Sequence, residues 1–286
     1  MPSSRDIKRR ISSVTNTQQI TRAMKLVSSA KLRRTRGAWQ AAAPYCRRLS
    51  LMLSRLAPSS GGHPWLAEKE EEGRVLYVAI GSNRGLAGSF NVCLHRFLDD
   101  ILSAETRDYD LIVSGSRLVD YCGRRGYHLV DTLDDIGDNP GFEPSRELAR
   151  RLTDSFDRGE YAAVYLVHAA FHSSLVPQAV RRRLLPLPPP DTPETGPEEE
   201  EEDFIIEPSP KELLKAVLPL YANTMVYTAL VEAKAAEHGA RMAAMSSATD
   251  NAREMISELT LSLNRARQAA ITTEISEIVG GAAALS

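Results

Sequence analysis

The sequence predicts an α/β domain inserted between two long terminal helices that pair as an antiparallel coiled coil. Both ends of the chain carry long stretches with few helix-breaking residues and with apolar side chains at three- and four-residue steps. The stretch between them alternates short β-rich runs with helical runs, which is typical of a mainly parallel sheet with helical crossovers. With 286 residues, the chain is long enough to bury a core.

The N-terminal helix is expected over residues 4–56, as the main part of a coiled-coil domain at 1–56. Ser3 and Asp6 offer a capping box at its start. Gly37 and Pro44 interrupt the pattern, so a bend or break is expected there. The narrow apolar stripe that we expect to form the seam consists of Ile7, Ile11, Val14, Ile20, Met24 and Val27.

The middle of the chain is expected to form a Rossmann-like α/β domain over 74–185. The predicted strands are 74–80, 109–115, 127–133 and 161–171, with an edge strand within 176–187. The predicted crossover helices are 91–105, 116–126 and 144–160. A proline-rich acidic segment at 186–208 then separates this domain from the C-terminal helix.

The C-terminal helix is expected over 209–286, with Ser209 as N-cap, Pro210 in the first helical position and Glu212 completing the box. Pro219 should kink it early. The forty residues between Gly239 and Gly280 would span roughly 60 Å as one helix. The expected seam consists of Met245, Ala248, Ala252, Met255, Leu259, Leu263, Ala266 and Ala270, extended by Ile271, Ile275, Ile278 and Ala282. A helix of this length needs a partner, which the N-terminal helix can supply.

The net charge of -2 conceals a strongly basic N-terminal arm. Residues 1–60 carry 13 Lys and Arg against the single acid Asp6, whereas residues 61–208 carry 15 basic and 28 acidic side chains. A merely solvated helix face would mix both signs, so we expect the arm to meet an acidic partner. Nucleic acid and an acidic protein surface both fit this charge, although aromatic interleaving and a reading motif are missing.

The sequence offers little for catalysis, cofactors or membrane insertion. Cys46, Cys93 and Cys122 show no CxxC spacing, so we expect no zinc site and a reducing compartment. No apolar run approaches the ~20 residues that cross a bilayer. The glycine-containing turn at 81–91 follows a strand and precedes a helix, but it matches no phosphate-binding motif. We therefore interpret it as a structural turn, with a nucleotide-binding enzyme as a weaker alternative.

Two terminal motifs resemble one family. "SRDIKRRISSVTNTQQITRAMKLVSSAKLRR" at 4–34 and "RMAAMSSATDNAREMISELTLSLNRARQAAITTEISEIVGGAAAL" at 241–285 resemble the terminal signatures of the gamma subunit of F-type ATP synthases. The intermediate pieces "SNRGLAGSFN", "VPQAVRRRLLPL" and "FIIEPSPKELL" follow in the same order. Some bacteria hold a second, alternative F-type enzyme, and its gamma subunit would show the same pattern.

The resemblance implies a rotor shaft without catalytic residues or cofactors. In this family the paired terminal helices enter a ring of three alpha and three beta subunits. The α/β domain, together with the epsilon subunit, rests on the membrane c-ring. Rotation couples ion flow to ATP synthesis or hydrolysis. The resemblance also implies a peripheral location on the cytoplasmic face of the bacterial inner membrane, no nucleic-acid partner, and membrane contact only through the complex.

The same resemblance assigns candidate contact residues. Met24 falls beside an acidic lever of the beta subunit, with Arg22 and Lys25 in the same helical turn, and Arg241 opens the matching C-terminal face. Arg267 and Gln268 fall where the family's shaft contacts a beta-subunit loop. Phe204 and Glu207 fall in a foot segment near the c-ring and epsilon. The turn departs from the family pattern at Asn83 and Ala87, where aspartate and cysteine are common.

Overall fold

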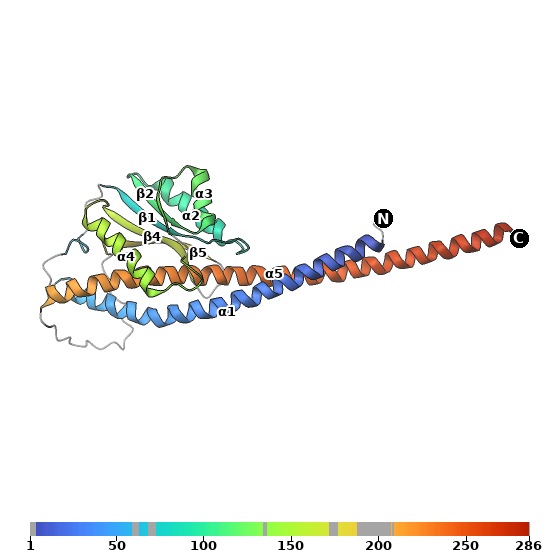
Figure 1. Cartoon of the computed structure of the whole chain (residues 1–286), viewed down its shortest axis with the longest axis horizontal. Helices are drawn as coiled ribbons and strands as arrows, with labels where there is room; N and C mark the ends of the chain where they lie inside the picture. The colour runs from blue at the N-terminus through green and yellow to red at the C-terminus, as the bar shows by residue number, and fades with distance from the viewer. Residues whose placement is uncertain are drawn as a thin grey trace. The chain divides into compact units, whose positions relative to one another are not determined.

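The computed structural model describes residues 4–58, 63–67, 73–133, 136–171, 177–187, 207 and 209–285. The described chain contains five helices and five strands (Figure 1). The helices are α1 (Ser4–Leu56), α2 (Phe90–Ala104), α3 (Ser116–Arg125), α4 (Phe142–Asp157) and α5 (Pro210–Leu285). The strands are β1 (Val75–Ile80), β2 (Tyr109–Ser114), β3 (Leu129–Leu133), β4 (Ala163–Ala170) and β5 (Gln178–Leu185).

The strands form one sheet in the order β3-β2-β1-β4-β5. Strands β1 to β4 pair in parallel, and β5 pairs antiparallel with β4 at the edge. Helices α2, α3 and α4 provide the connections between the parallel strands, as such a sheet requires. The predicted fold class is therefore confirmed. The expected edge strand is present as β5, and the structure adds that it runs antiparallel to β4.

Each face of the sheet is covered by its own helices. Along β1, Tyr77 and Ala79 point into a core shared with α2 and α3. The alternate residues Leu76, Val78 and Ile80 point to the other face, where α4, α1 and α5 pack. This alternation follows from the two-residue period of a strand, and burial on both faces explains why β1 is apolar throughout.

The two terminal helices run through their expected interruptions. Helix α1 continues past Gly37 and Pro44, and α5 continues past Pro219. At the start of α5 the backbone N–H of Glu212 donates to the Ser209 hydroxyl at 3.3 Å, which confirms the predicted N-cap. Ser3 lies outside the described residues, so the expected capping box of α1 stays a prediction.

The chain divides into two compact units. One comprises the chain up to Ser28 together with the chain from Met242 onward, and the other is Ser29–Arg241. In the first unit the Thr249 hydroxyl donates to Thr21 Oγ1 at 2.9 Å, and Lys25 Nζ donates to Ser246 Oγ at 2.9 Å. The partner number falls from 249 to 246 as the number on α1 rises from 21 to 25, so the helices are antiparallel, as predicted.

The seam of this helix pair differs from the predicted stripe. Ile20 and Val27 of α1 are 60% and 55% exposed, and Met255 of α5 is 49% exposed, so these seam assignments are wrong. Their places are taken by small polar residues, because Thr21, Ser28 and Thr249 are buried. Ile7, Met245 and Ala252 are buried as predicted. Apolarity alone therefore misplaces the middle of the seam.

Helix α5 also departs from the expectation that no segment suits a membrane. An 18-residue window within Pro210–Ser276 has a mean hydropathy of 1.2, so by length and composition alone the helix could cross a bilayer. In the structure 61% of that window is buried. Burial of this kind is what a core helix shows, and we interpret α5 in that way.

Candidate functional site

The turn between β1 and α2, residues 81–88, is built by close packing of two strand ends. A Cβ on Gly81 would lie 2.6 Å from Leu118 Cβ. Gly115, at φ +94°, passes so near that its own Cβ would lie 2.6 Å from the carbonyl carbon of Gly81. Glycine is needed at both positions, because this approach leaves no room for a side chain. The turn is thereby set against the start of α3.

Hydrogen bonds within the domain use much of the turn's polar surface. The backbone N–H of Ser116 donates to Asn83 Oδ1 at 3.0 Å, and its hydroxyl donates to the Asn83 carbonyl at 2.9 Å. The Ser82 hydroxyl lies 2.9 Å from the Arg84 carbonyl and 2.7 Å from Asn91 Oδ1, and its single hydrogen can serve one of them at a time. These contacts favour the structural interpretation of the turn over a phosphate site.

Facing this domain, α5 presents an unusual row of buried charged and titratable side chains. We call it the α5 polar row. It consists of Glu232, Lys234, Glu237, His238 and Arg241. Such side chains are rarely buried unless they are paired, so the partners of each must be identified.

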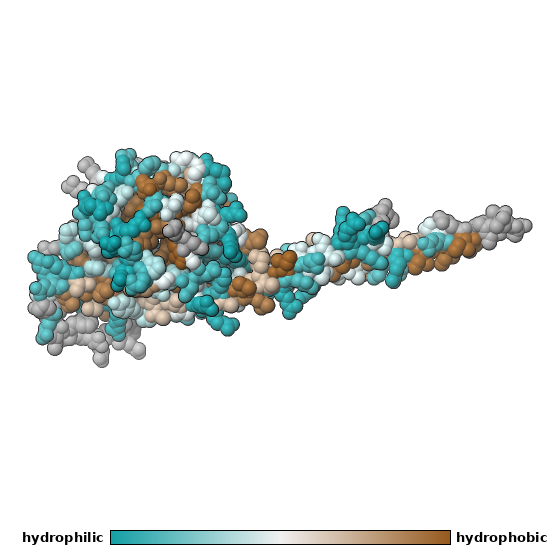
Figure 2. All heavy atoms as spheres, viewed as in Figure 1, coloured by the Kyte–Doolittle hydropathy of each residue, from teal (hydrophilic) through white to brown (hydrophobic). Residues whose placement is uncertain are grey.

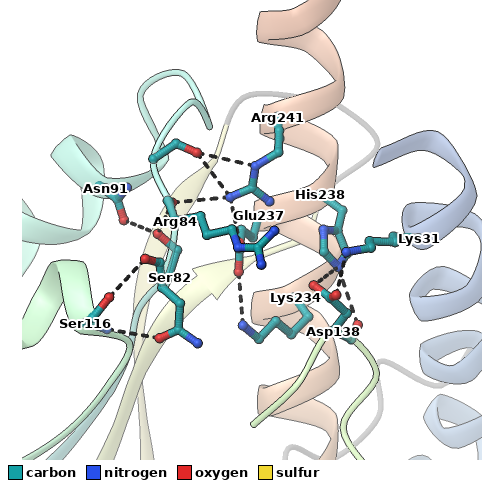
Figure 3. Close-up of polar contacts among 12 residues, drawn as sticks. Lys31, Ser82, Arg84, Asn91, Ser116, Asp138, Lys234, Glu237, His238 and Arg241 are labelled. Carbon is teal, nitrogen blue, oxygen red and sulfur yellow. Dashed lines mark hydrogen bonds and ion pairs between the residues drawn. The ribbon is translucent and has the colours of Figure 1, made fainter. Parts of the chain in front are cut away.

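Arg241 ties α5 to the turn (Figure 3). Its Nη2 donates to the carbonyls of Arg84 and Gly85 at 3.3 and 3.4 Å, and its Nε lies 3.4 Å from the Gly85 carbonyl. The same guanidinium pairs with Glu237 Oε1 at 2.8 Å. The other carboxylate oxygen of Glu237 accepts from Lys234 Nζ at 3.1 Å.

A second polar contact joins three parts of the chain: helix α1, helix α5 and the loop that precedes α4. Lys31 Nζ of α1 lies 2.5 Å from Asp138 Oδ2, and Nε2 of His238 lies 3.7 Å from the other oxygen of that carboxylate (Figure 3). Burial raises the pKa of Asp138, but the hydrogen bond and charge of Lys31 outweigh it and hold that pKa below its usual value. Burial is the main cause that lowers the pKa of His238, so its neutral form is favoured.

A third contact lies at the end of β4. Glu232 Oε1 accepts from the backbone N–H of Phe171 at 3.1 Å, and Glu232 Oε2 pairs with Arg182 Nη1 of β5 at 2.9 Å. Close by on β4, His168 is fully buried, and this burial lowers its pKa to about 3, helped by the charge of Arg182. Neutral His168 thus belongs to the core of the domain.

The predicted contact residues occupy different environments in the two units. Arg22 is exposed, while Met24 and Lys25 are half-buried, and Lys25 is bonded to Ser246 within the helix pair. Arg241 is buried in the other unit, with its guanidinium bound inside the chain. A direct contact between Arg241 and a partner protein stays a prediction.

The remaining predicted contacts lie on the C-terminal part of α5 and before its start. Arg267 and Gln268 are exposed. Glu207 is exposed as well, whereas Phe204 lies outside the described residues. The register of the antiparallel helix pair explains why this part of α5 is exposed. Thr21 lies opposite Thr249, so Ser4, the first described residue of α1 and 17 residues before Thr21, lies near residue 266 of α5. Within the described chain, α5 therefore runs on unpaired from about residue 267.

Helix α5 exposes a set of large apolar side chains over this unpaired part. Figure 2 shows apolar residues on the surface of the C-terminal portion of α5. The set consists of Ile271, Ile275, Ile278 and Val279, each 48% to 72% exposed. Ile271, Ile275 and Ile278 were predicted as seam residues, and their exposure shows that this assignment is wrong, because α1 does not cover them. An apolar stripe of this kind indicates an interaction surface.

The side chains described above form hydrogen bonds and ion pairs within the chain. Among the described residues, no three His, Cys, Asp or Glu side chains gather in a way that could hold a metal ion. The absence of an expected cofactor stays a prediction of the sequence.

Of the residues in the α5 polar row, only Arg241 is predicted from the sequence. The signal for the row is the segment "ALVEAKAAEHGAR" at 229–241, where charged residues alternate with alanine. Spacings of three and four residues usually indicate solvent-exposed ion pairs on a helix surface. The alanines were the better clue, because small side chains let a helix approach its neighbour closely, and they lie buried beside the charges.

Comparisons with known proteins agree over the whole chain. A family model described as ATP synthase matches residues 3–285. The ATP synthase gamma chain of Desulforamulus reducens is 47% identical over 290 residues, and the match covers 100% of both chains. The ATP synthase gamma chain of Pelotomaculum thermopropionicum is 45% identical over 287 residues, again with 100% of both chains covered.

Solved structures with a similar fold come from rotors of larger assemblies. The rotor of the Euglena gracilis mitochondrial ATP synthase in rotational state 1 matches with a TM-score of 0.64 and 18% identity, covering 94% of this chain and 98% of that one. The central stalk and c-ring structure of the Tetrahymena thermophila mitochondrial ATP synthase gives a TM-score of 0.60 and 21% identity, covering 80% and 99%. At these identities the likeness concerns the fold.

Proposed function

The chain belongs to the ATP synthase gamma-chain family and is a central-stalk rotor subunit, and from this premise we propose how its parts transmit torque. The paired terminal helices act as the shaft within a ring of three alpha and three beta subunits. The sheet-bearing domain, with the epsilon subunit, rests on the membrane c-ring. The chain itself is non-catalytic, and its rotation couples ion flow to ATP synthesis or hydrolysis. The complex holds it peripherally at the cytoplasmic face of the bacterial inner membrane.

The unpaired apolar end of α5 is the observation that carries this proposal. Side chains such as Ile271, Ile275 and Ile278 stay largely exposed, although moving such a side chain from full exposure to full burial stabilises by roughly 1.5–3 kcal/mol and burial of the exposed part would gain a share of this. Nothing in the described chain covers them, so a partner that surrounds the helix end accounts for their apolarity. A ring of subunits around the shaft would supply such a surface.

We assign the rotor–stator contacts to residues of the two terminal helices. Arg22, Met24 and Lys25 would meet the acidic lever of a beta subunit, where attraction between opposite charges acts over about 8–10 Å at physiological salt. Arg267 and Gln268 would meet a beta-subunit loop, and Arg241 would contribute through the face it opens. Phe204 and Glu207 are proposed as contacts at the foot, toward epsilon and the c-ring.

Co-purification tests the proposed partners. A tagged full-length chain should be isolated with the alpha, beta and epsilon subunits and the c-ring from cells that express the whole complex. The alternative of a nucleic-acid-binding coiled coil gains no support from the comparisons, whose matches are ATP synthase chains. A chain that failed to assemble with alpha and beta subunits, yet bound DNA with steep salt dependence, would overturn the proposal.

A further inference from the structure

Glu237 lies at the centre of the tie between α5 and the β1–α2 turn. Its side chain is 6% exposed and lies between Lys234 and Arg241. All three residues belong to α5. One carboxylate oxygen serves each cation. The guanidinium of Arg241 is planar, so an anion that fixes one edge also sets the direction of its other donors. In the structure Nη2, the atom that binds Glu237, also donates to the Arg84 and Gly85 carbonyls, and the neighbouring Nε lies 3.4 Å from the Gly85 carbonyl.

We propose that Glu237 is a positioning residue that, through Arg241, locks residues 82–88 of the turn onto α5 so that the turn moves with the helix. The proposal deepens the rotor function and rests on it. Glu237 itself does not touch the turn in any hydrogen bond that the described residues form. Its effect is to keep the buried guanidinium in the orientation that reaches the Arg84 and Gly85 carbonyls.

The conformation of the turn shows that it needs such a restraint. Leu86 has φ +60°, a left-handed conformation that strains any residue with a side chain, and it is nevertheless 64% exposed. Packing of the Leu86 side chain therefore does not account for the strain. The residues on either side are held instead: Gly85 by Arg241, and Ala87 by burial beside Ala236 and Ala240 of α5.

The position of Arg241 along α5 gives this tie a mechanical meaning. Arg241 is the last residue of α5 that belongs to the sheet-bearing unit. On this proposal, a twist applied to the helix beyond this residue is resisted by the hydrogen bonds that join Arg241 to the β1–α2 turn. A carboxylate that holds the guanidinium in place therefore contributes to the stiffness of the transmission, whereas its removal leaves two buried cations, Lys234 and Arg241, without their anion.

Amide hydrogen exchange on the full-length chain tests the positioning role directly. In Glu237→Gln, the amides of residues 84–88 should exchange roughly fivefold or more faster, the factor expected from loss of one or two local hydrogen bonds, while strand β2 is unchanged. Glu232→Gln is the matched control, because Glu232 is equally buried on α5 but contacts Phe171 and Arg182 instead of the turn. It should leave 84–88 unchanged.

Arg241→Gln shows whether Glu237 acts through Arg241. The single Arg241 variant should raise exchange at 84–88, and the double variant should raise it no further, since both substitutions break the same link. Additive effects, or faster exchange spread evenly over the sheet after Glu237→Gln, would overturn the proposal. If Glu237→Gln fails to fold, Arg241→Lys keeps the charge but loses the planar fork, and the same local increase is expected.

The assembled ATP synthase supplies the functional readout. In complexes that carry Glu237→Gln, ATP-driven ion pumping should fall relative to ATP hydrolysis in the same preparation, because a looser turn transmits torque less stiffly. An unchanged ratio combined with faster local exchange would refute the mechanical part of the proposal. Failure of the unsubstituted chain to assemble with alpha and beta subunits would instead refute the rotor function, so the two failures are distinguishable.

Discussion

Each buried charge on α5 is tolerated at the residue scale because a specific partner of opposite sign or a backbone dipole satisfies it. Glu232 has Arg182 and a backbone N–H, and Glu237 has two cations. Removing one partner strands the other in a poorly solvated place, which costs more than replacing both. His168 and His238 avoid a buried charge in a different way. Burial lowers the pKa of each histidine, so that the neutral ring is favoured.

Acid should destabilise the isolated chain through His168. Its pKa in the folded chain is about 3, against 6.5 for an ordinary histidine, so between these values the unfolded chain binds a proton that the folded chain does not. The stability contribution is complete above pH 6.5 and falls by up to about 1.4 kcal/mol for each pH unit below it. Urea unfolding at pH 7, 6, 5 and 4 measures this slope.

His168→Leu provides the comparison for that slope. Leucine has no proton to bind, so the free energy of unfolding should fall less steeply with decreasing pH than in the unsubstituted chain. His238 contributes in the same direction, because burial lowers its pKa too, and some slope therefore remains. Equal slopes in the two proteins would show that His168 does not carry the effect.

The helix pair shows at the element scale why a seam is hard to locate from sequence. Strand and helix positions in the middle domain follow from local alternation and turn residues, and β1, α2 and β5 begin and end within a few residues of their predicted bounds. In the seam, however, Thr21 hydrogen-bonds Thr249 across the interface while Ile20 points outward. Polar residues that satisfy each other can take seam positions, and no single helix reveals that partnership.

The candidate site illustrates the same limit more strongly. Glu237 and Arg241 are four residues apart and suggest an ordinary ion pair on a helix surface. Their burial depends on the turn at 84–85, more than 150 positions earlier in the chain. The turn itself could be predicted from its glycines, but its attachment to α5 depends on tertiary packing. The resemblance pointed to Arg241 without indicating which groups inside the chain hold it.

The observed seam predicts that two methionines of α5 differ sharply. Met245 is buried, whereas Met255 is 49% exposed. Met245→Ala should cost roughly 2–4 kcal/mol of helix-pair stability through lost burial and a cavity. Met255→Ala should change it by no more than about 0.5 kcal/mol. Thermal unfolding followed by circular dichroism at 222 nm compares the two variants. A similar loss in both would favour the stripe expected from apolarity over the observed seam.

At the scale of the whole molecule, α5 carries two tasks in one helix. Up to Arg241 it is the core helix of the sheet-bearing unit, and from Met242 onward it belongs to the helix pair. Beyond about residue 266 it continues for 19 more described residues without α1, about 28 Å at 1.5 Å per residue. The fold of the isolated chain does not require this last part, so its sequence is free to serve a partner.

Ile275→Pro separates those two tasks. Proline removes a helical hydrogen bond and clashes with the preceding turn, at a local cost of about 3 kcal/mol or more, so the end of α5 should lose its helix. Because Ile275 is exposed and lies beyond the pairing with α1, the unfolding free energy of the isolated chain should change by no more than about 0.5 kcal/mol. In the assembled complex, coupled ATP synthesis should fall.

Ile275→Ala, which keeps the helix and removes only the apolar side chain, distinguishes a need for helical stiffness from a need for contact at this position. Coupled synthesis at the normal rate in the proline variant would show that the shaft does not need its end intact, and the exposed stripe would then require another explanation.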